Sequence, residues 1–141
     1  MLNKLCILLF SISILLFSCE KEAMPGDCPE DIICTAVFVT VTIPVDWVTM
    51  RPEGIKRSET IIAESGKILA TFEDYQNNPG IPFYGIQVVN DLHIPSLKTD
   101  GTDLIVRVYG TTNNLLKEFT CTAGHDCCHV VKIKGPDKLA L

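Results

Sequence analysis

One apolar stretch decides the predicted fold, and it reads Ile33-Cys34-Thr35-Ala36-Val37-Phe38-Val39-Thr40-Val41-Thr42-Ile43-Pro44-Val45. Every second side chain from Val37 to Ile43 is β-branched and apolar. That alternation is typical of a strand with one buried face. Pro44 lacks a backbone N–H, so it marks the end of the strand or an edge position. We therefore expect a β-rich domain to be built on residues 33–45.

Further short apolar stretches follow, separated by residues typical of turns. The stretches are 60–63, 67–72, 83–94, 104–109, 116–122 and 129–134, and the turns are expected at 51–56, 76–82, 111–114 and 123–126. A hairpin is the simplest interpretation of the first two stretches, with a short helix over 58–63, capped by Ser58, as the alternative. The pattern predicts an all-β fold, an antiparallel β-sandwich of about seven strands, immunoglobulin-like or transthyretin-like.

The first eighteen of the 141 residues have the pattern of a secretory signal. Lys4 supplies one positive charge, and residues 5–17 are apolar apart from two serines. This apolar core is too short to span a bilayer comfortably, because a spanning helix needs about 20 residues. We predict three segments: a signal peptide at 1–18, a tether at 19–31 and the sandwich at 32–141.

The signal ends in Leu16-Phe17-Ser18-Cys19, which resembles the lipobox of bacterial lipoproteins. The resemblance implies that Cys19 becomes the first residue of the mature chain and carries the lipid. Two or more acyl chains hold a protein stably at a membrane, whereas one holds it marginally. Glu20 rather than aspartate follows Cys19, which by the same resemblance favours the outer membrane, periplasmic or surface face undecided. An ordinary signal peptide, or an uncleaved anchor, is the alternative.

The charge of the chain argues against nucleic-acid binding. The formal net charge is −5, and loss of the signal's one lysine makes the mature chain about −6. The sequence shows no basic stripe that could follow a phosphate backbone. The partners we expect are the membrane, through the lipid at Cys19, and a protein or glycan at the cell surface.

Five cysteines remain after Cys6 leaves with the signal and Cys19 is lipidated. They are Cys28, Cys34, Cys121, Cys127 and Cys128. Exported proteins meet an oxidising environment, so disulfides are expected. Because five is odd, at least one thiol is left over or pairs between chains.

Two motifs resemble small lipoproteins of Gram-negative bacteria: Cys34-Thr35 at the opening of the first strand, and Cys127-Cys128-His129-Val130 near the end. The resemblance implies a sandwich like the carboxypeptidase regulatory domain and implies no reaction. The cysteines that belong to the matching motifs are Cys34 and the vicinal pair. Their two segments can be neighbours where the termini of a sandwich meet. We therefore predict a bridge from Cys34 to Cys127 or Cys128. Cys28 and Cys121, which look like additions to the pattern, would form the second bridge and leave one of Cys127 and Cys128 free. A vicinal Cys127–Cys128 bridge is the competitor.

Other residues could support further chemistry, and each set also has a plainer structural explanation. Cys127, Cys128, His129 and His125 have metal-binding side chains, but neighbouring residues on a strand point to opposite faces, so we expect no metal and no other cofactor. A Cys-His nucleophile would need a free thiolate. Asp91, His93, Asp100 and Asp103 are interpreted as solvated turn residues. Trp47, Tyr75, Phe83 and Tyr84 are interpreted as core rather than as a carbohydrate-binding face.

No catalytic set stands out, so we predict a non-catalytic binding or assembly module rather than an enzyme. The alternative is a small exported hydrolase or thiol-redox protein that uses the C-terminal cysteines.

Overall fold

The computed structural model describes residues 28–29, 31–46, 54–73, 75 and 85–140. These residues form seven strands and one short 3-10 helix, which confirms the all-β prediction. In chain order the elements are β1 (Thr40–Ile43), β2 (Ile55–Ile62), β3 (Ile68–Glu73), β4 (Ile86–Asn90), the 3-10 helix η3 (Asp91–Ser96), β5 (Thr102–Gly110), β6 (Leu115–His125) and β7 (Val130–Lys134).

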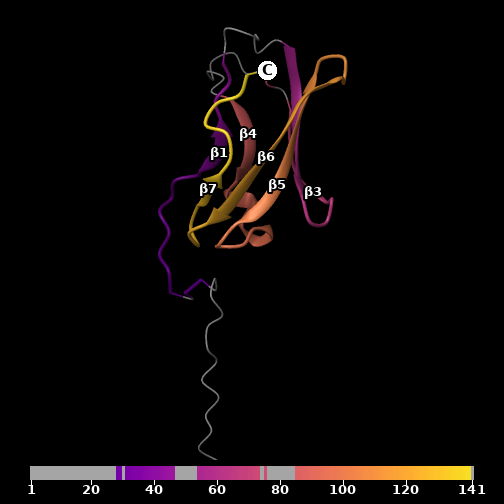
Figure 1. Cartoon of the computed structure of the whole chain (residues 1–141). Coiled ribbons are helices and arrows are strands. Elements are labelled where there is room, and N and C mark those ends of the chain that lie inside the picture. Colours follow the sequence, from indigo (N-terminus) through magenta and orange to yellow (C-terminus); the bar gives the residue numbers. More distant parts are fainter. Residues whose placement is uncertain (1–27, 30, 47–53, 74, 76–84, 141) are drawn as a thin grey trace, which may run out of the picture.

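The strands make two antiparallel sheets (Figure 1). The larger sheet has the order β3-β2-β5-β6-β7, and the smaller sheet is the pair β1-β4. The ladder between β5 and β6 runs from Thr102 opposite Ala123 to Tyr109 opposite Leu115. Among the described residues, β7 ends the larger sheet, and β1 has β4 as its one partner strand in the smaller sheet.

One apolar core joins the two sheets. Strand β5 alternates strictly, so that Leu104, Val106 and Val108 are fully buried while the residues between them are not. Ile43 of β1 and Val88 of β4 meet this face from the smaller sheet. Such two-sheet packing buries one face of each sheet, which is the solution that period-two sequences require.

Two buried hydroxyl groups of β2 also tie the sheets together. Thr60 Oγ1 donates to the Val88 carbonyl oxygen at 2.6 Å, and Ser58 Oγ donates to the Gln87 carbonyl oxygen at 3.0 Å. Both side chains are fully buried. A buried hydroxyl without a partner would be costly, so these contacts fix the register of β4 over β2.

The first predicted strand is shorter than expected. Strand β1 begins at Thr40, and residues 31–39 are irregular, with Val37 exposed. Val41 and Ile43 are buried as the alternation predicts. The period-two pattern also covers the residues just before Thr40. Strand β4 does not pair with them, because it ends at Asn90, opposite Thr40.

The strand predicted over 83–94 is divided differently. Strand β4 stops at Asn90, whose side chain accepts a hydrogen bond from Leu92 N and caps η3. The turn predicted over 123–126 is also displaced, because Ala123 to His125 still belong to β6. The hairpin of β2 and β3 replaces the alternative of a helix over 58–63. The loop predicted over 76–82 lies outside the described residues.

The C-terminal tail returns to the start of the sandwich. Val45 and Leu139 form a parallel bridge, with Leu139 N donating to Pro44 O and Asp46 N donating to Leu139 O, each at 2.8 Å. The first strand therefore has the tail beside it, and no ladder joins β1 directly to β7 among the described residues.

Candidate functional site

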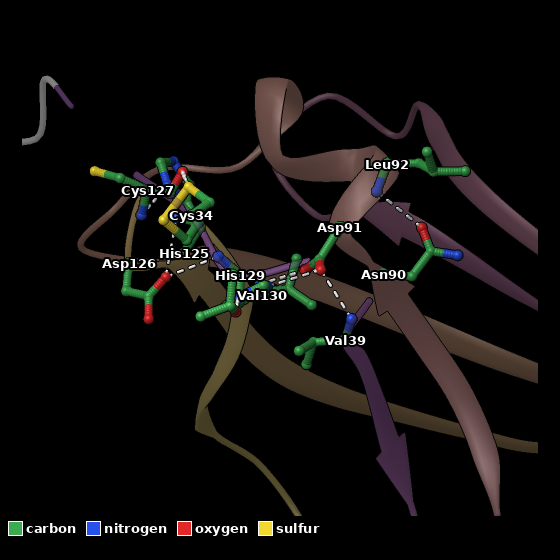
Figure 2. Close-up of polar contacts among 12 residues, drawn as sticks. Cys34, Val39, Asn90, Asp91, Leu92, His125, Asp126, Cys127, His129 and Val130 are labelled. Atoms are coloured by element: carbon green, nitrogen blue, oxygen red, sulfur yellow. Dashed lines mark hydrogen bonds and ion pairs between the residues drawn. A yellow bond between two sulfur atoms is a disulfide. The ribbon is translucent and has the colours of Figure 1, made fainter. Parts of the chain in front are cut away.

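The turn between β6 and β7 carries the vicinal cysteines (Figure 2). The Asp126 carboxylate accepts hydrogen bonds from the backbone N–H of Cys128 at 3.0 Å and of His129 at 2.7 Å. These hydrogen bonds hold the pKa of the Asp126 carboxyl below its ordinary value. Cys127 adopts a left-handed φ of 76°, which is uncommon for a residue with a side chain. Cys127 and Cys128 therefore lie in a turn that is fixed by its own aspartate, rather than on a strand.

Each vicinal cysteine forms a disulfide with a different upstream cysteine. Cys34 pairs with Cys128 and Cys28 pairs with Cys127, with Cα–Cα distances of 5.2 and 5.4 Å. The predicted bridge from Cys34 to one of the pair is confirmed. The predicted Cys28–Cys121 bridge is wrong, and so is the free thiol at Cys127 or Cys128. The predicted tether is thus bonded to the domain at Cys28.

Cys121 is the free cysteine among the described residues, and it is 4% exposed. It lies on the inner face of β6 opposite Leu104, and Cys28 is bonded to Cys127 instead. Burial raises the pKa of the Cys121 thiol to about 11. At neutral pH it is therefore a small apolar side chain rather than a nucleophile.

Asp91, predicted from the sequence to be a solvated turn residue, is the centre of a polar cluster. Its side chain is only 13% exposed. The carboxylate accepts hydrogen bonds from Val39 N at 2.8 Å, Val130 N at 2.9 Å and the His129 ring at 2.9 Å. Burial by itself would raise the pKa of the Asp91 carboxyl, but these hydrogen bonds, with His129 first, hold it below its ordinary value. The expectation of a solvated turn residue is wrong for Asp91.

His129 extends this cluster to the segment before β1. Its Nδ1 faces Asp91 Oδ2, and its Nε2 lies 2.9 Å from Thr35 Oγ1. An ionised carboxylate only accepts hydrogen bonds, so Nδ1 carries the hydrogen, and in that tautomer Nε2 is the acceptor for the Thr35 hydroxyl. The result is a continuous chain of hydroxyl, imidazole and carboxylate, the arrangement in which a hydroxyl can be activated.

His125 is held in one orientation beside the first disulfide. Its Nε2 donates to the Leu97 carbonyl oxygen at 3.1 Å, so Nδ1 is the acceptor of the Cys127 N–H, also at 3.1 Å. Nδ1 lies 4.0 Å from Cys28 Sγ. Cys28, His125 and Cys127 could hold a metal by their spacing alone, but both sulfurs are engaged in a disulfide and neither is a thiolate.

The metal set suggested by the sequence is not brought together. Cys127 and Cys128 are oxidised in separate bridges, and His129 is bonded to Asp91. Of the four residues in that set, only Cys127 and His125 belong to the described group whose side chains lie close enough together to hold a metal ion.

The remaining sequence candidates take local structural roles. His93 completes the cap of η3 at the Asn90 backbone, and Asp103 accepts from Thr122 Oγ1 at 2.7 Å. Asp100 is exposed in its turn. Tyr75 packs against the core and its hydroxyl lies 2.6 Å from Ser58 Oγ, as the core interpretation predicts. Cys19, Trp47, Phe83 and Tyr84 lie outside the described residues.

Two cavities lie away from the cluster. The first, of about 490 Å³, is lined by residues of β5, β6 and the end of β7, including Asp103, Cys121 and Lys134. The second, of about 390 Å³, lies beside the turn after β2 and includes Glu64 and Lys98. Neither is lined by Thr35, Asp91 or His129.

Fold and site together define an all-β, two-sheet domain whose N-terminal segment is joined to its last hairpin by two disulfides and by the Asp91 cluster. No family model, curated protein or solved structure matches the chain. Within the described part of the chain, no helix has the length and apolar character needed to cross a bilayer.

Proposed function

We propose that the protein is an outer-membrane lipoprotein, anchored through Cys19, whose β-sandwich serves as a non-catalytic binding or assembly module. The observation that carries the proposal is the apolar run at residues 5–17, which is followed by Ser18 and then Cys19. Disulfides persist in oxidising compartments, so the bridges Cys28–Cys127 and Cys34–Cys128 support export.

The anchor is tested by Cys19→Ala in the full-length chain. We expect the variant to leave the membrane fraction or to keep its signal segment, and to incorporate no labelled palmitate. Cys6→Ala is the matched control, because it removes a cysteine from within the apolar run and should change neither result. Palmitate in the Cys19→Ala protein would contradict the proposal.

The module role is tested by chemical cross-linking in intact membranes followed by capture of the protein. We expect defined partner bands that disappear when the sandwich is replaced by an unrelated domain on the same anchor. Equal bands with either domain would mean that the anchor alone determines its neighbours.

A hydrolase is the second candidate, favoured by the chain from Thr35 through His129 to Asp91. In such a reaction the Thr35 oxygen attacks an acyl carbon while its proton passes to His129 Nε2. The imidazolium then returns the proton to the leaving group, and water releases the acyl group by the same route. The cysteines themselves offer no thiolate here, because Cys127 and Cys128 are both oxidised.

A panel of activated esters separates the two candidates. Hydrolysis that falls at least 100-fold in both Thr35→Val and His129→Gln, but not in His93→Gln, would establish the hydrolase. Unchanged background rates in all three variants would leave the binding module as the function.

A further inference from the structure

The segment before β1 is clamped to the sandwich while its apolar side chains face outward. We call residues 31–39 the strap. Its fixed points are the Cys34–Cys128 disulfide, the Thr35–His129 contact and the Val39–Asp91 hydrogen bond. Just upstream, Cys28 is bonded to Cys127. The strap is therefore attached at both ends and near its middle.

Between these fixed points the strap exposes large apolar side chains. Ile33 is 95% exposed, Val37 64% and Phe38 58%, and Ile32 is 42% exposed. Single exposed apolar residues are ordinary on protein surfaces. Several of them within one short, covalently clamped segment mark an interaction surface instead.

The position of the strap in the chain identifies what it meets. Only eight residues lie between Cys19 and Cys28, and the nine residue-to-residue steps reach roughly 30 Å at about 3.5 Å per extended residue. The strap begins three residues after Cys28, so it is the first part of the domain that the chain reaches after a lipid at Cys19. Figure 1 shows the strap running along the outside of the sandwich, at the side where the chain enters from residue 28.

The charge of the strap indicates the kind of contact. Asp31 is acidic, and residues 28–39 contain no lysine or arginine. Attraction to anionic headgroups is therefore not available, and apolar area is what the strap offers. Side chains of this kind enter the boundary between headgroups and acyl chains, about 5–10 Å deep.

We propose that the strap is a membrane-docking surface that lays Ile33, Val37 and Phe38 into the same lipid leaflet that holds the acyl chains of Cys19. The proposal rests on the lipid anchor proposed above. It adds a second membrane contact, which fixes the orientation of the sandwich on the bilayer. The disulfides then serve to keep the apolar side chains displayed rather than folded into the core.

The test uses the full lipidated protein in phosphatidylcholine vesicles, with and without brominated acyl chains that quench indole fluorescence. Trp47 is replaced by phenylalanine, so that a single added tryptophan is the only source of indole fluorescence. Ile33→Trp places the probe on the strap, and Ile68→Trp is the control, because Ile68 is 54% exposed on β3 at the far edge of the larger sheet. Both substitutions are at exposed side chains, so folding should be retained.

We expect brominated lipid to quench the residue 33 probe at least twice as strongly as the residue 68 probe. Equal quenching in protein that floats with the vesicles would overturn the docking surface and leave the anchor intact. Protein that fails to float would overturn the anchor instead. A dimer in detergent that shields the residue 33 probe would show that a second copy covers the strap, and would also overturn the proposal.

Discussion

Asp91 Oδ2 and His129 Nδ1 lie 2.9 Å apart although 38 residues separate them in the chain, and the same carboxylate holds Val39 N and Val130 N. Three elements meet at this one side chain: the end of the strap, the start of η3 and the start of β7. The carboxylate is the only charge-bearing acceptor that these donors share in the described cluster, so its ionisation should be linked to stability.

Asp91→Asn should lower the free energy of unfolding by about 2 kcal/mol at pH 7, because hydrogen bonds to a charged acceptor are among the stronger ones. The folded-state pKa of Asp91 is depressed. Its contribution is therefore complete above the ordinary value of 3.8 and is lost as the pH falls through the folded-state pKa. The wild type should lose its advantage over the variant below about pH 4.

Urea unfolding at several pH values measures this difference. Asp100→Asn is the control, because Asp100 is exposed and should change stability little at any pH. A difference between wild type and Asp91→Asn that stays constant from pH 7 to pH 2 would contradict the prediction.

The two disulfides should stabilise the fold non-additively. Each alone closes a loop of more than 90 residues, worth about 4.7 kcal/mol on chain entropy. Once one bridge is closed, the other closes a loop of roughly eight residues, worth about 2.5 kcal/mol. Removing either pair should therefore cost about 2.5 kcal/mol, and removing both about 7 kcal/mol.

Guanidinium unfolding of the two paired alanine variants and the quadruple variant completes this cycle. Costs that simply add would show that the two bridges constrain separate parts of the unfolded chain.

Cys121 should resist alkylation in the native state. Burial raises its thiol pKa from 9.0 to about 11, so the thiolate fraction at pH 8 falls about a hundredfold, and the side chain is also shielded. Iodoacetamide should label Cys121 only after the protein is unfolded. No reductant is added, so that the two disulfides stay closed. Peptide mapping assigns the label, and fast native labelling at Cys121 would mean that β6 opens readily.

Thr60→Val should cost about 1–2 kcal/mol, because it leaves the Val88 carbonyl without the donor that crosses between the sheets. The shape of the side chain is nearly unchanged, so the loss reports the hydrogen bond. Thr71→Val on the exposed side of β3 is the control and should be nearly neutral. Equal thermal unfolding midpoints for the two variants would refute this role.

Much of the sheet could be predicted because strand alternation is local. The pattern at Leu104, Val106 and Val108 requires only that one face be buried, and the structure buries it. The start of the first strand could not be predicted, because Val37 and Val39 continue the alternation of Val41 and Ile43 without a partner strand beside them.

The site was harder to predict, because its geometry depends on distant partners. Asp91 looked like a turn residue, and its donors at Val39 and Val130 lie 52 and 39 residues away. The one local signal was Asn90-Asp91, a capping residue followed by an acid at the start of a helical turn. The cysteine pairing depends on the left-handed Cys127, which strand parity could not reveal.

The Cys28–Cys127 bond also determines where mechanical load enters the protein. A pull on the chain upstream of Cys28 passes through the sulfurs to the turn between β6 and β7, and bypasses the strap. Residues 31–39 then stay slack under tension, and their noncovalent contacts through Thr35 and Val39 are not peeled away one by one. The hairpin of β6 and β7 would bear the force, with the paired strands of the larger sheet behind it.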